Sequence, residues 1–243
     1  MSDAREAYDA WHRQRAAAAD PLAFPWYASA FADIDKNARG RLLEVGCGRG
    51  DFAIWLARTM PHLDIAAVDF SGAAIELARS RAAAEKSNII FSIGDAERLE
   101  LPDRSFDYVV SCECIEHVEH PAAAAREIRR VLKPGGRFCL TTENYFNGML
   151  IAWLNAWATR QPFNSGAGVQ PRENFFLFWR VRRYLQDAGL AVDRTESCHY
   201  QWLLLPGVDP ARLCTRTFSS AWASALAKPF GRHFSFFGHR PPE

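Results

Sequence analysis

The chain has 243 residues, of which 49% are apolar and 23% are charged, and its formal net charge is +1. This composition is typical of a folded globular protein and excludes the disordered and fibrous classes. A chain of this length accommodates one α/β domain with a full core, so we expect residues 1–243 to form a single domain. The nearly balanced charge predicts no large basic surface, which disfavours nucleic acid as a partner.

The start of the chain, Met1-Ser2-Asp3-Ala4-Arg5-Glu6, lacks the apolar stretch of a signal peptide. No run of the sequence approaches the ~20 apolar residues that a membrane-spanning helix needs. The six cysteines lack the short repeated pairing of a metal site, so free thiols are the simplest interpretation. These features together lead us to expect a cytoplasmic protein, and they leave its oligomeric state open.

Short apolar runs alternate with longer stretches of helical spacing between residues 41 and 143. This order predicts a parallel sheet with helices on both faces. The last helix of the series should stop at Lys133-Pro134-Gly135-Gly136, because proline and glycine end helices. Strands are expected at 41–46, 64–69, 89–94, 106–111 and 136–142, and helices at 51–59, 71–85 and 121–132.

A glycine turn, Glu44-Val45-Gly46-Cys47-Gly48-Arg49-Gly50, follows the first strand and precedes a helix. Three glycines at alternate positions allow left-handed backbone and keep side chains away from a ligand resting on the turn. The helix that follows offers unpaired N–H groups and the positive end of its dipole to an anionic group. The turn therefore predicts a site for a nucleoside-bearing cofactor. Its G-x-G-x-G spacing differs from the G-x-G-x-x-G of dinucleotide-binding enzymes.

A carboxylate stands at the end of each of the next two strands. Asp69 ends the second strand, where it can accept hydrogen bonds from both hydroxyls of a ribose, although capping of the helix before Ser71 is an alternative. Asp95 follows the third strand, where it can accept from an adenine amino group or serve as a turn aspartate. Because ligands bind beyond the carboxyl ends of parallel strands, we expect both carboxylates to line one site with the glycine turn.

Acids after the first three strands, at Glu44, Asp69 and Asp95, and the run Leu132–Arg137 before the fifth strand form an ordered set. In order and spacing this set resembles the class I S-adenosylmethionine-dependent methyltransferases, in particular the small-molecule, ubiquinone O-methyltransferase-like branch. The resemblance implies a Rossmann-like α/β fold with a seven-stranded sheet in the order 3-2-1-4-5-7-6, strand seven being antiparallel. In that fold, 181–188 would be the last helix, 190–195 the sixth strand and 234–238 the seventh.

The resemblance implies an enzyme that uses S-adenosyl-L-methionine to methylate an oxygen or nitrogen of a small, aromatic or lipophilic molecule, with oxygen preferred. The rate of such a transfer depends mainly on positioning of the acceptor against the methyl carbon. The amino-acid end of the cofactor would lie over the glycine turn, its ribose on Asp69 and its adenine by Asp95, with Phe70 beside the ring. The residues assigned in this way to the cofactor are Glu44, Gly46, Cys47, Gly48, Gly50, Asp69, Phe70, Ser71, Asp95, Ala96 and Cys112.

An E-x-x-E-H segment, made by Glu113, Glu116 and His117, follows the fourth strand. His117 is the best-placed base for a hydroxyl acceptor, and ordering of the loop is the structural alternative. The three side chains also resemble the signature that ubiquinone-type O-methyltransferases associate with a divalent cation, which would make this a metal-assisted O-methyltransferase. Those relatives supply a further histidine after the fifth strand, whereas here only Glu173 or the distant His199 could substitute. We therefore predict no metal site.

Three segments lie outside the expected sheet core, at residues 1–37, 144–178 and 198–232. In the family that the chain resembles, such insertions form the lid over the acceptor, so specificity is expected there and cofactor binding in 38–143. The second segment carries an apolar helical stripe, which we interpret as core or lid, with an acceptor wall or a contact with a membrane surface or partner as alternatives. The stripe is Phe146, Met149, Leu150, Trp153, Leu154 and Trp157.

Two other classes of protein compete with an active methyltransferase. One is an inactive member that keeps the fold as a cofactor-binding or assembly module, which the intact glycine turn and acids disfavour. The other is a nicotinamide oxidoreductase, which the spacing of the glycines disfavours. A cluster of arginines on the helix at 121–132, namely Arg126, Arg129 and Arg130, is expected on a solvated face.

Overall fold

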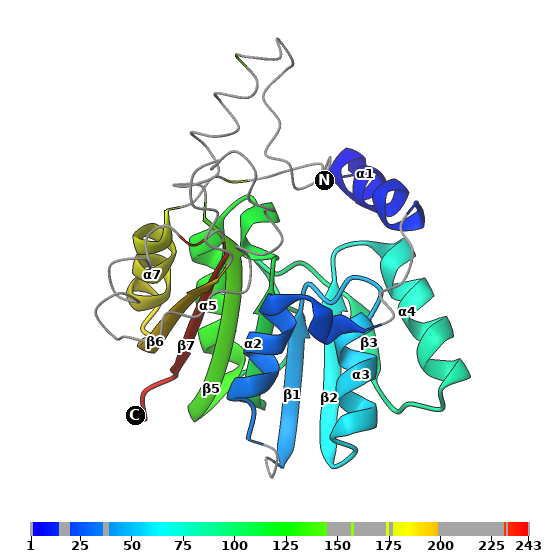
Figure 1. The fold of residues 1–243 in the computed structure, drawn as a ribbon, viewed down its shortest axis with the longest axis horizontal. Helices are drawn as coiled ribbons and strands as arrows, with labels where there is room; N and C mark the ends of the chain where they lie inside the picture. The colour runs from blue at the N-terminus through cyan, green and yellow to red at the C-terminus, as the bar shows by residue number, and fades with distance from the viewer. Residues whose placement is uncertain are drawn as a thin grey trace, which may run out of the picture.

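The computed structural model describes residues 2–14, 20–35, 39–144, 177–198 and 233–242, together with the single residues 157, 174 and 231. Its centre is one seven-stranded sheet in the order β3-β2-β1-β4-β5-β7-β6 (Figure 1). This is the predicted order. The pairs among β1 to β5 are parallel, and β7 runs antiparallel to both of its neighbours, as expected.

The strands lie close to their predicted positions, and the largest difference is at the start of β5. That strand begins at Leu132 rather than at 136, because the run Lys133-Pro134-Gly135-Gly136 forms a bulge in it instead of a loop before it. The bulge appears as a shift in the register between Phe106 and Tyr108 of β4 and their partners on β5. The strands are β1 Gly40–Val45, β2 Leu63–Asp69, β3 Ile90–Ile93, β4 Phe106–Cys112, β5 Leu132–Glu143, β6 Ala191–Cys198 and β7 His233–His239.

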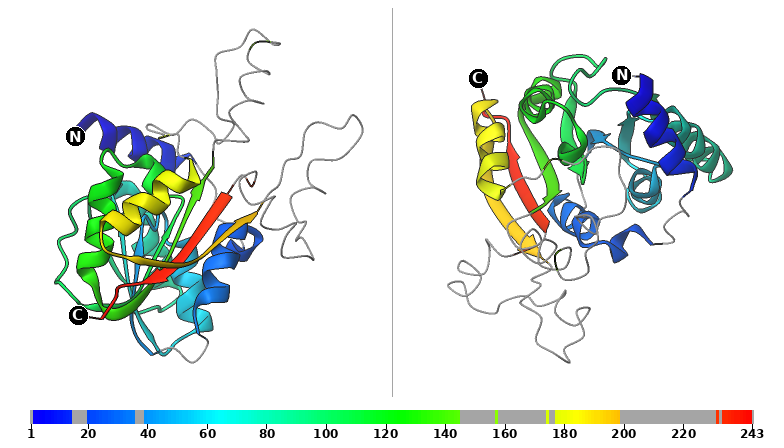
Figure 2. Two further views of the ribbon diagram at one scale, coloured as in Figure 1. Left: turned by 90° about the vertical axis from the view of Figure 1, so that its left-hand side faces the viewer. Right: turned by 90° about the horizontal axis from the view of Figure 1, so that it is seen from above.

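Helices cover both faces of the sheet, with α2, α3 and α4 on one face and α5 and α7 on the other (Figure 2). Each face has its own buried cluster, centred on Phe52 and Ile75 in the first and on Ile128 and Phe138 in the second. The helix α3 has the predicted bounds. The helices are α1 Ser2–Arg13, α2 Pro25–Asp33, α3 Asp51–Thr59, α4 Gly72–Ala84, α5 Pro121–Val131 and α7 Phe178–Asp187, with short 3₁₀ helices η1 Pro21–Ala23 and η2 Ile115–His117.

The helix α2 belongs to the core, so the prediction that the whole of residues 1–37 lies outside the core is wrong. Ala30 is fully buried, and the ring of Tyr27 stacks on Phe52 with centroids 4.8 Å apart. At the end of the helix, Asp33 accepts a hydrogen bond of 2.6 Å from the hydroxyl of Tyr108 in β4. Apolar residues at helical spacing thus give α2 one face that the sheet buries.

Arg130 is also less exposed to solvent than the sequence suggests. Its guanidinium donates to the backbone oxygens of Leu99 and Leu101, each at 2.7 Å, and forms ion pairs with Glu127 and Asp103. Arg126 on the same helix is exposed, as predicted. The helical pattern could not distinguish the two, because the partners of Arg130 come mostly from the connection between β3 and β4.

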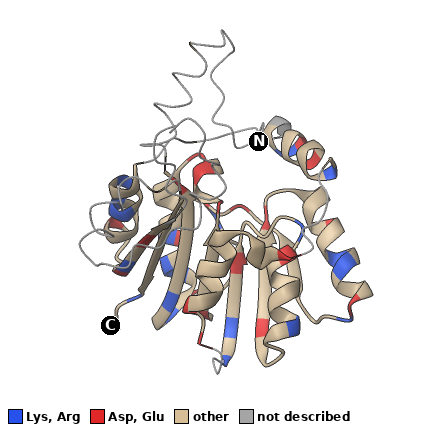
Figure 3. Cartoon of the chain, in the orientation of Figure 1, with Lys and Arg blue, Asp and Glu red and all other residues tan. Residues whose placement is uncertain are grey.

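Several predictions fall on segments that the structure does not describe. The apolar stripe of residues 146–157 lies outside the described residues, apart from the exposed Trp157, and so does nearly all of 198–232. The lid roles of these segments therefore stay predictions. Among the described residues, no helix has the length and apolar character needed to cross a bilayer. In the view of Figure 3, Lys and Arg are scattered over the described elements rather than gathered into one basic patch.

Candidate functional site

The glycine turn leaves β1 in left-handed backbone, with φ values of +78°, +52° and +73° at Gly46, Gly48 and Gly50. The N–H groups of Gly46 and Cys47 both donate to the backbone oxygen of Val68, at 2.8 and 3.0 Å, and so fix the turn against β2. A Cβ at Gly46 would lie 2.6 Å from the sulfur of Cys114. Glycine is therefore required at position 46 both by the dihedral angle and by the neighbour.

Asp69 lies at the end of β2 beside this turn, where the sequence predicts it. Its carboxylate accepts from the N–H of Gly48 at 2.7 Å and from the N–H of Ser71 at 2.9 Å. Burial raises the pKa of Asp69, and the His12 ring and the two backbone N–H groups oppose that rise. Each oxygen keeps a lone pair, so the carboxylate can still accept from a ligand hydroxyl.

Glu44, the acid before the first glycine, is almost fully buried, with 1% of its surface exposed. Among the described residues, no donor reaches good hydrogen-bond geometry with its side-chain oxygens, although the backbone N–H of Ala53 is near enough to lower the pKa of Glu44. Burial, and then the nearby Asp51 carboxylate, raise the pKa of Glu44 to about 8. A buried acceptor without a partner is costly, so a ligand ammonium at this place would be stabilising.

The three predicted acids lie near one another at the ends of the first three strands. The N–H of Gly94 donates to the backbone oxygen of Asp69 at 2.9 Å, which brings the ends of β2 and β3 side by side. Burial first, and then Asp69, Glu116 and Asp95, raise the pKa of the Cys114 thiol. Because Cys114 also fills the space beneath Gly46, the thiol lies among the carboxylates that follow the strands.

The other residues assigned to the cofactor surround this centre. Ser71 is fully buried and caps α4, its hydroxyl accepting from the N–H of Ala74 at 3.1 Å. Cys47 is buried in the turn, and Cys112 is buried against the backbone of Trp26, on the α2 face of the sheet. The contacts of these residues with a cofactor stay predictions, as do those of the partly buried Phe70 and Ala96.

The helix α1 lies over the same end of the sheet and packs against α4, which the sequence did not predict (Figure 1). Asp9 accepts from the Ser71 hydroxyl at 2.5 Å and from the Ala73 N–H at 3.1 Å. The ring of Tyr8 lies 6.4 Å from that of Phe70, edge-on. His12 is 8% exposed, and its ring lies 3.3 Å from where a Cβ on Gly48 would be. Because each of these contacts joins residues that lie far apart in the sequence, no short sequence motif could predict them.

The side chains of the E-x-x-E-H segment lie near one another but have different hydrogen-bond partners. Glu113 lies 3.1 Å from the Nδ1 atom of His233, whereas Glu116 accepts from the Thr142 hydroxyl at 2.9 Å. Burial, and then the charge of Glu113, raise the pKa of Glu116 to about 8. His117 lies in η2 and its ring centroid is 6.3 Å from that of Tyr8. The Nε2 atom of His117 lies 3.9 Å from a carboxylate oxygen of Glu116, so these two side chains are neighbours, while Glu113 pairs with His233.

Comparison with known proteins finds similarity to methyltransferases over the part of the chain that carries the glycine turn and the acids. A family described as "Methyltransferase domain" matches residues 43–140. A malonyl-acyl-carrier-protein O-methyltransferase from a Paenibacillus species is 37% identical over 117 residues, which are 45% of this chain and 42% of the relative. A demethylmenaquinone methyltransferase from Deinococcus radiodurans is 38% identical over 115 residues, 47% of this chain and 48% of the relative.

Solved structures extend the likeness to the whole fold. An S-adenosylmethionine-dependent methyltransferase from Thermotoga maritima superposes with a TM-score of 0.62 and 19% identity, covering 98% of this chain and 96% of its own. The sequence matches are shorter, and this chain spans about half the length of the curated relatives. The stretch matched by the methyltransferase family, residues 43–140, contains the glycine turn, Asp69, Asp95 and the E-x-x-E-H segment, and it ends within β5.

Proposed function

We propose that this chain carries a class I S-adenosylmethionine-dependent methyltransferase domain and transfers the methyl group of S-adenosylmethionine to a small molecule, which the match of residues 43–140 to a methyltransferase family supports. The acceptor atom is an oxygen or a nitrogen, with oxygen preferred, and the acceptor is aromatic or lipophilic. The observation that supports the proposal most is the placement of Glu44, Asp69 and Asp95 at the same end of the sheet as a turn of three left-handed glycines.

The residues at the turn suit each part of the cofactor. The buried Glu44 carboxyl has no donor in good hydrogen-bond geometry among the described residues and would accept from the cofactor's ammonium. The bare backbone at Gly48 would take the carboxylate end, and Asp69 would accept from the ribose hydroxyls. Asp95 would hold the adenine amino group. The cofactor itself supplies a methyl group on a positively charged sulfur.

Positioning is the main contribution of the protein to such a transfer. A bound acceptor aligned with the methyl carbon needs no covalent intermediate with the enzyme. We propose that His117 takes the proton from a hydroxyl acceptor, because it follows β4 and its ring faces Tyr8 of α1. Its alternative role, in ordering the loop, would leave turnover unchanged when the ring is removed.

Calorimetric titration with S-adenosylmethionine tests the cofactor site. The wild type should bind one equivalent, and Asp69→Asn should bind about 10- to 100-fold more weakly, the scale of a lost charged hydrogen bond of roughly 1–3 kcal/mol. Asp64→Asn is the matched control, since Asp64 lies in the same strand with its side chain 55% exposed. Absence of binding, or binding of a nicotinamide dinucleotide in its place, would overturn the proposal.

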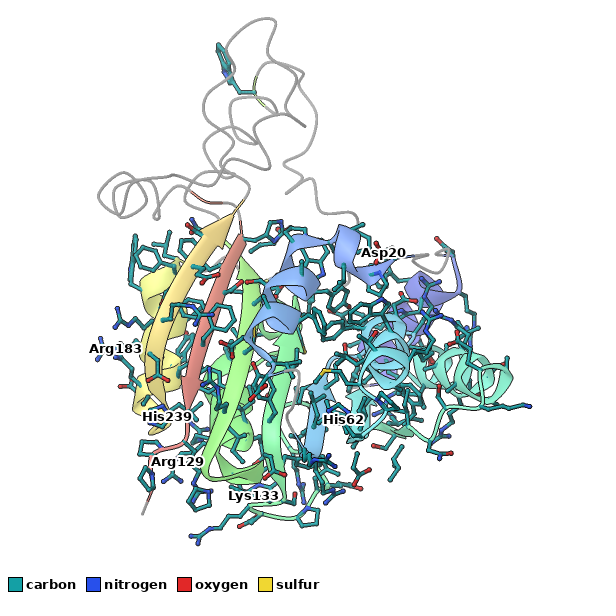
Figure 4. The ribbon with its side chains drawn as sticks, turned by 60° about the horizontal axis from the view of Figure 1, so that its bottom comes forward. Asp20, His62, Arg129, Lys133, Arg183 and His239 are labelled. Atoms are coloured by element: carbon teal, nitrogen blue, oxygen red, sulfur yellow. The ribbon has the colours of Figure 1, made fainter. Side chains whose placement is uncertain are left out.

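Turnover is tested by release of S-adenosylhomocysteine in the presence of a panel of small phenols, hydroxy acids and amines. His117→Ala should lower kcat by more than tenfold and leave the affinity for the cofactor unchanged, as expected for loss of a general base. The control is His62→Ala, an exposed histidine labelled in Figure 4. A protein that binds the cofactor but methylates none of these acceptors would support the inactive binding module.

A further inference from the structure

We propose that Glu113, Glu143 and His233 form a binding site for a divalent first-row cation such as Mn²⁺ or Zn²⁺. One ligand atom of each residue lies within 4.8 Å of the other two. This set shares only Glu113 with the E-x-x-E-H segment. Glu116 accepts from Thr142, and His117 lies 3.9 Å from Glu116 and beside Tyr8. The sequence predicts no metal because the E-x-x-E-H segment lacks a further ligand, whereas these three residues are brought together only by the fold.

The sheet itself brings the three residues together. Glu143 is the last residue of β5 and His233 is the first residue of β7, and the two are direct partners in the antiparallel register. Side chains of such partners lie on the same face, about 5 Å apart at Cβ. Glu113 follows β4 directly, and its N–H donates to the backbone oxygen of Thr141 in β5 at 3.1 Å.

Neighbouring groups fix the orientation of two of the ligands. The Thr141 hydroxyl donates to one oxygen of Glu113 at 2.9 Å, while the other oxygen lies 3.1 Å from the Nδ1 of His233. His233 is only 4% exposed, and the ring of Trp26 packs against it at a centroid distance of 5.0 Å. Partners of this kind, which orient ligands without touching the ion, are typical of metal sites.

Charge and spacing both fit a cation. Two carboxylates this close repel one another, and a doubly charged ion would offset that repulsion. Bonds from protein ligands to divalent cations are about 2.0–2.6 Å long, so ligand atoms around one ion lie roughly 3–5 Å apart. One imidazole nitrogen with two carboxylate oxygens favours Mn²⁺ or Zn²⁺ over Ca²⁺ or Mg²⁺, which prefer oxygen ligands.

The position of the site gives the cation a role that rests on the proposed function. Glu113 follows β4 and Glu143 ends β5, at the same end of the sheet as the glycine turn after β1. A cation held by three protein ligands keeps positions for an acceptor hydroxyl and would lower the pKa of that hydroxyl. Binding of the cation itself does not depend on this role.

Titration of the chelator-stripped protein with Mn²⁺, followed by electron paramagnetic resonance, tests the site. The wild type should show one saturable site from which Zn²⁺ displaces Mn²⁺, and Glu143→Gln and His233→Gln should each weaken binding at least tenfold. His239→Gln is the matched control, because His239 lies at the opposite end of β7 and its Nδ1 is 2.9 Å from a carboxylate oxygen of Asp193 (Figure 4). The control should bind Mn²⁺ like the wild type.

Two results would overturn the inference. One is the absence of saturable binding of either ion by the wild type, which would leave Glu113 and His233 as a simple hydrogen-bonded pair. The other is equal binding by the wild type and Glu143→Gln. Since Glu143→Gln keeps the shape of the side chain, a cation-dependent rise in the Tm of the wild type but not of this variant gives a second readout. Cofactor titration of the same samples tests the proposed function separately.

Discussion

The carboxylate of Asp9, in α1, accepts a hydrogen bond of 2.5 Å from the hydroxyl of Ser71, the N-cap residue of α4. The same oxygen accepts from the N–H of Ala73 at 3.1 Å. Burial alone would raise the pKa of Asp9, but these two donors together with the charges of Arg13 and Arg5 outweigh burial and lower it. This contact therefore holds α1 against the start of α4, close to Asp69, the residue proposed to bind the ribose.

Replacing Asp9 should loosen α1. In Asp9→Ala, backbone amides of residues 5–13 should exchange with deuterium at least several-fold faster than in the wild type, because the helix loses a charged hydrogen bond to α4. The dissociation rate of S-adenosylmethionine should rise as well. Hydrogen–deuterium exchange measured by mass spectrometry checks that exchange becomes faster and that the change is confined to α1. The control is Glu6→Gln, at an exposed position on the same helix. Equal exchange in the two variants would contradict a fastening role.

Substitution of Gly46 should destabilise the protein more than substitution of another left-handed glycine. Gly135→Ala introduces only backbone strain, about 1–2 kcal/mol, because no atom lies within 4 Å of the added Cβ. Gly46→Ala adds a clash with the Cys114 side chain, which should cost a further 1–3 kcal/mol, roughly the scale of overpacking in a core. Urea unfolding of the two variants measures the difference. Equal free energies of unfolding would mean that the turn relaxes around the methyl group.

The cofactor-free protein should lose stability as the pH rises toward 8. A carboxyl whose pKa is raised by folding holds its proton longer in the folded state, so its contribution is complete below about pH 4.5 and is lost as the pH rises through the folded pKa. Glu44 and Glu116, both with pKa values of about 8, behave in this way. Each should cost at most about 1.4 kcal/mol per pH unit between roughly pH 5 and 8.

Glu116→Gln tests this dependence, because glutamine can still accept from Thr142 but cannot ionise. The free energy of unfolding of this variant, measured in urea from pH 5 to 9, should fall less steeply than that of the wild type. Glu119→Gln, at an exposed position after the same loop, should keep the slope of the wild type. Parallel pH profiles for the wild type and Glu116→Gln would show that Glu116 ionises normally.

Arg130 should contribute more to stability than its neighbour on α5. Arg130→Ala removes hydrogen bonds to Leu99, Leu101 and Glu127, which should lower the free energy of unfolding by about 1–3 kcal/mol. Arg126→Ala changes an exposed side chain and should stay within about 0.5 kcal/mol. Thermal unfolding of the two variants compares them directly. A similar loss in both would assign the effect to helix propensity.

Much of the fold could be predicted from the sequence, because in residues 38–143 each strand or helix is determined by its own short stretch of sequence. Each strand of the parallel part is a short apolar run. Glu44 lies one residue before the end of β1, Asp69 ends β2 and Asp95 follows β3, so the topology places all three at one end of the sheet. The predicted start of β5 was wrong because a Pro-Gly-Gly run is typical of a loop, whereas in this structure the run forms a bulge within the strand. The core position of α2 was missed because its partners are contributed by distant strands.

Other parts of the site carry no local signal. Asp9 meets Ser71 across 62 positions of the sequence, and Glu113 meets His233 across 120. The type of a residue indicates which chemistry its side chain can perform. Which side chains lie together is determined by the packing of α1 on α4 and by the pairing of β5 with β7. This is why the sequence grouped Glu113 with Glu116 and His117, whereas the fold groups it with Glu143 and His233.

The register of β6 and β7 has a consequence for how chains of this kind diversify. Cys198, the last residue of β6, is the partner of His233, the first residue of β7, so the chain leaves the sheet and returns to it at one point. Closing a longer loop at such a point costs only about 0.6 kcal/mol for each doubling of its length. Insertions, deletions or whole replacements between these two residues can therefore be accommodated without unpairing a strand.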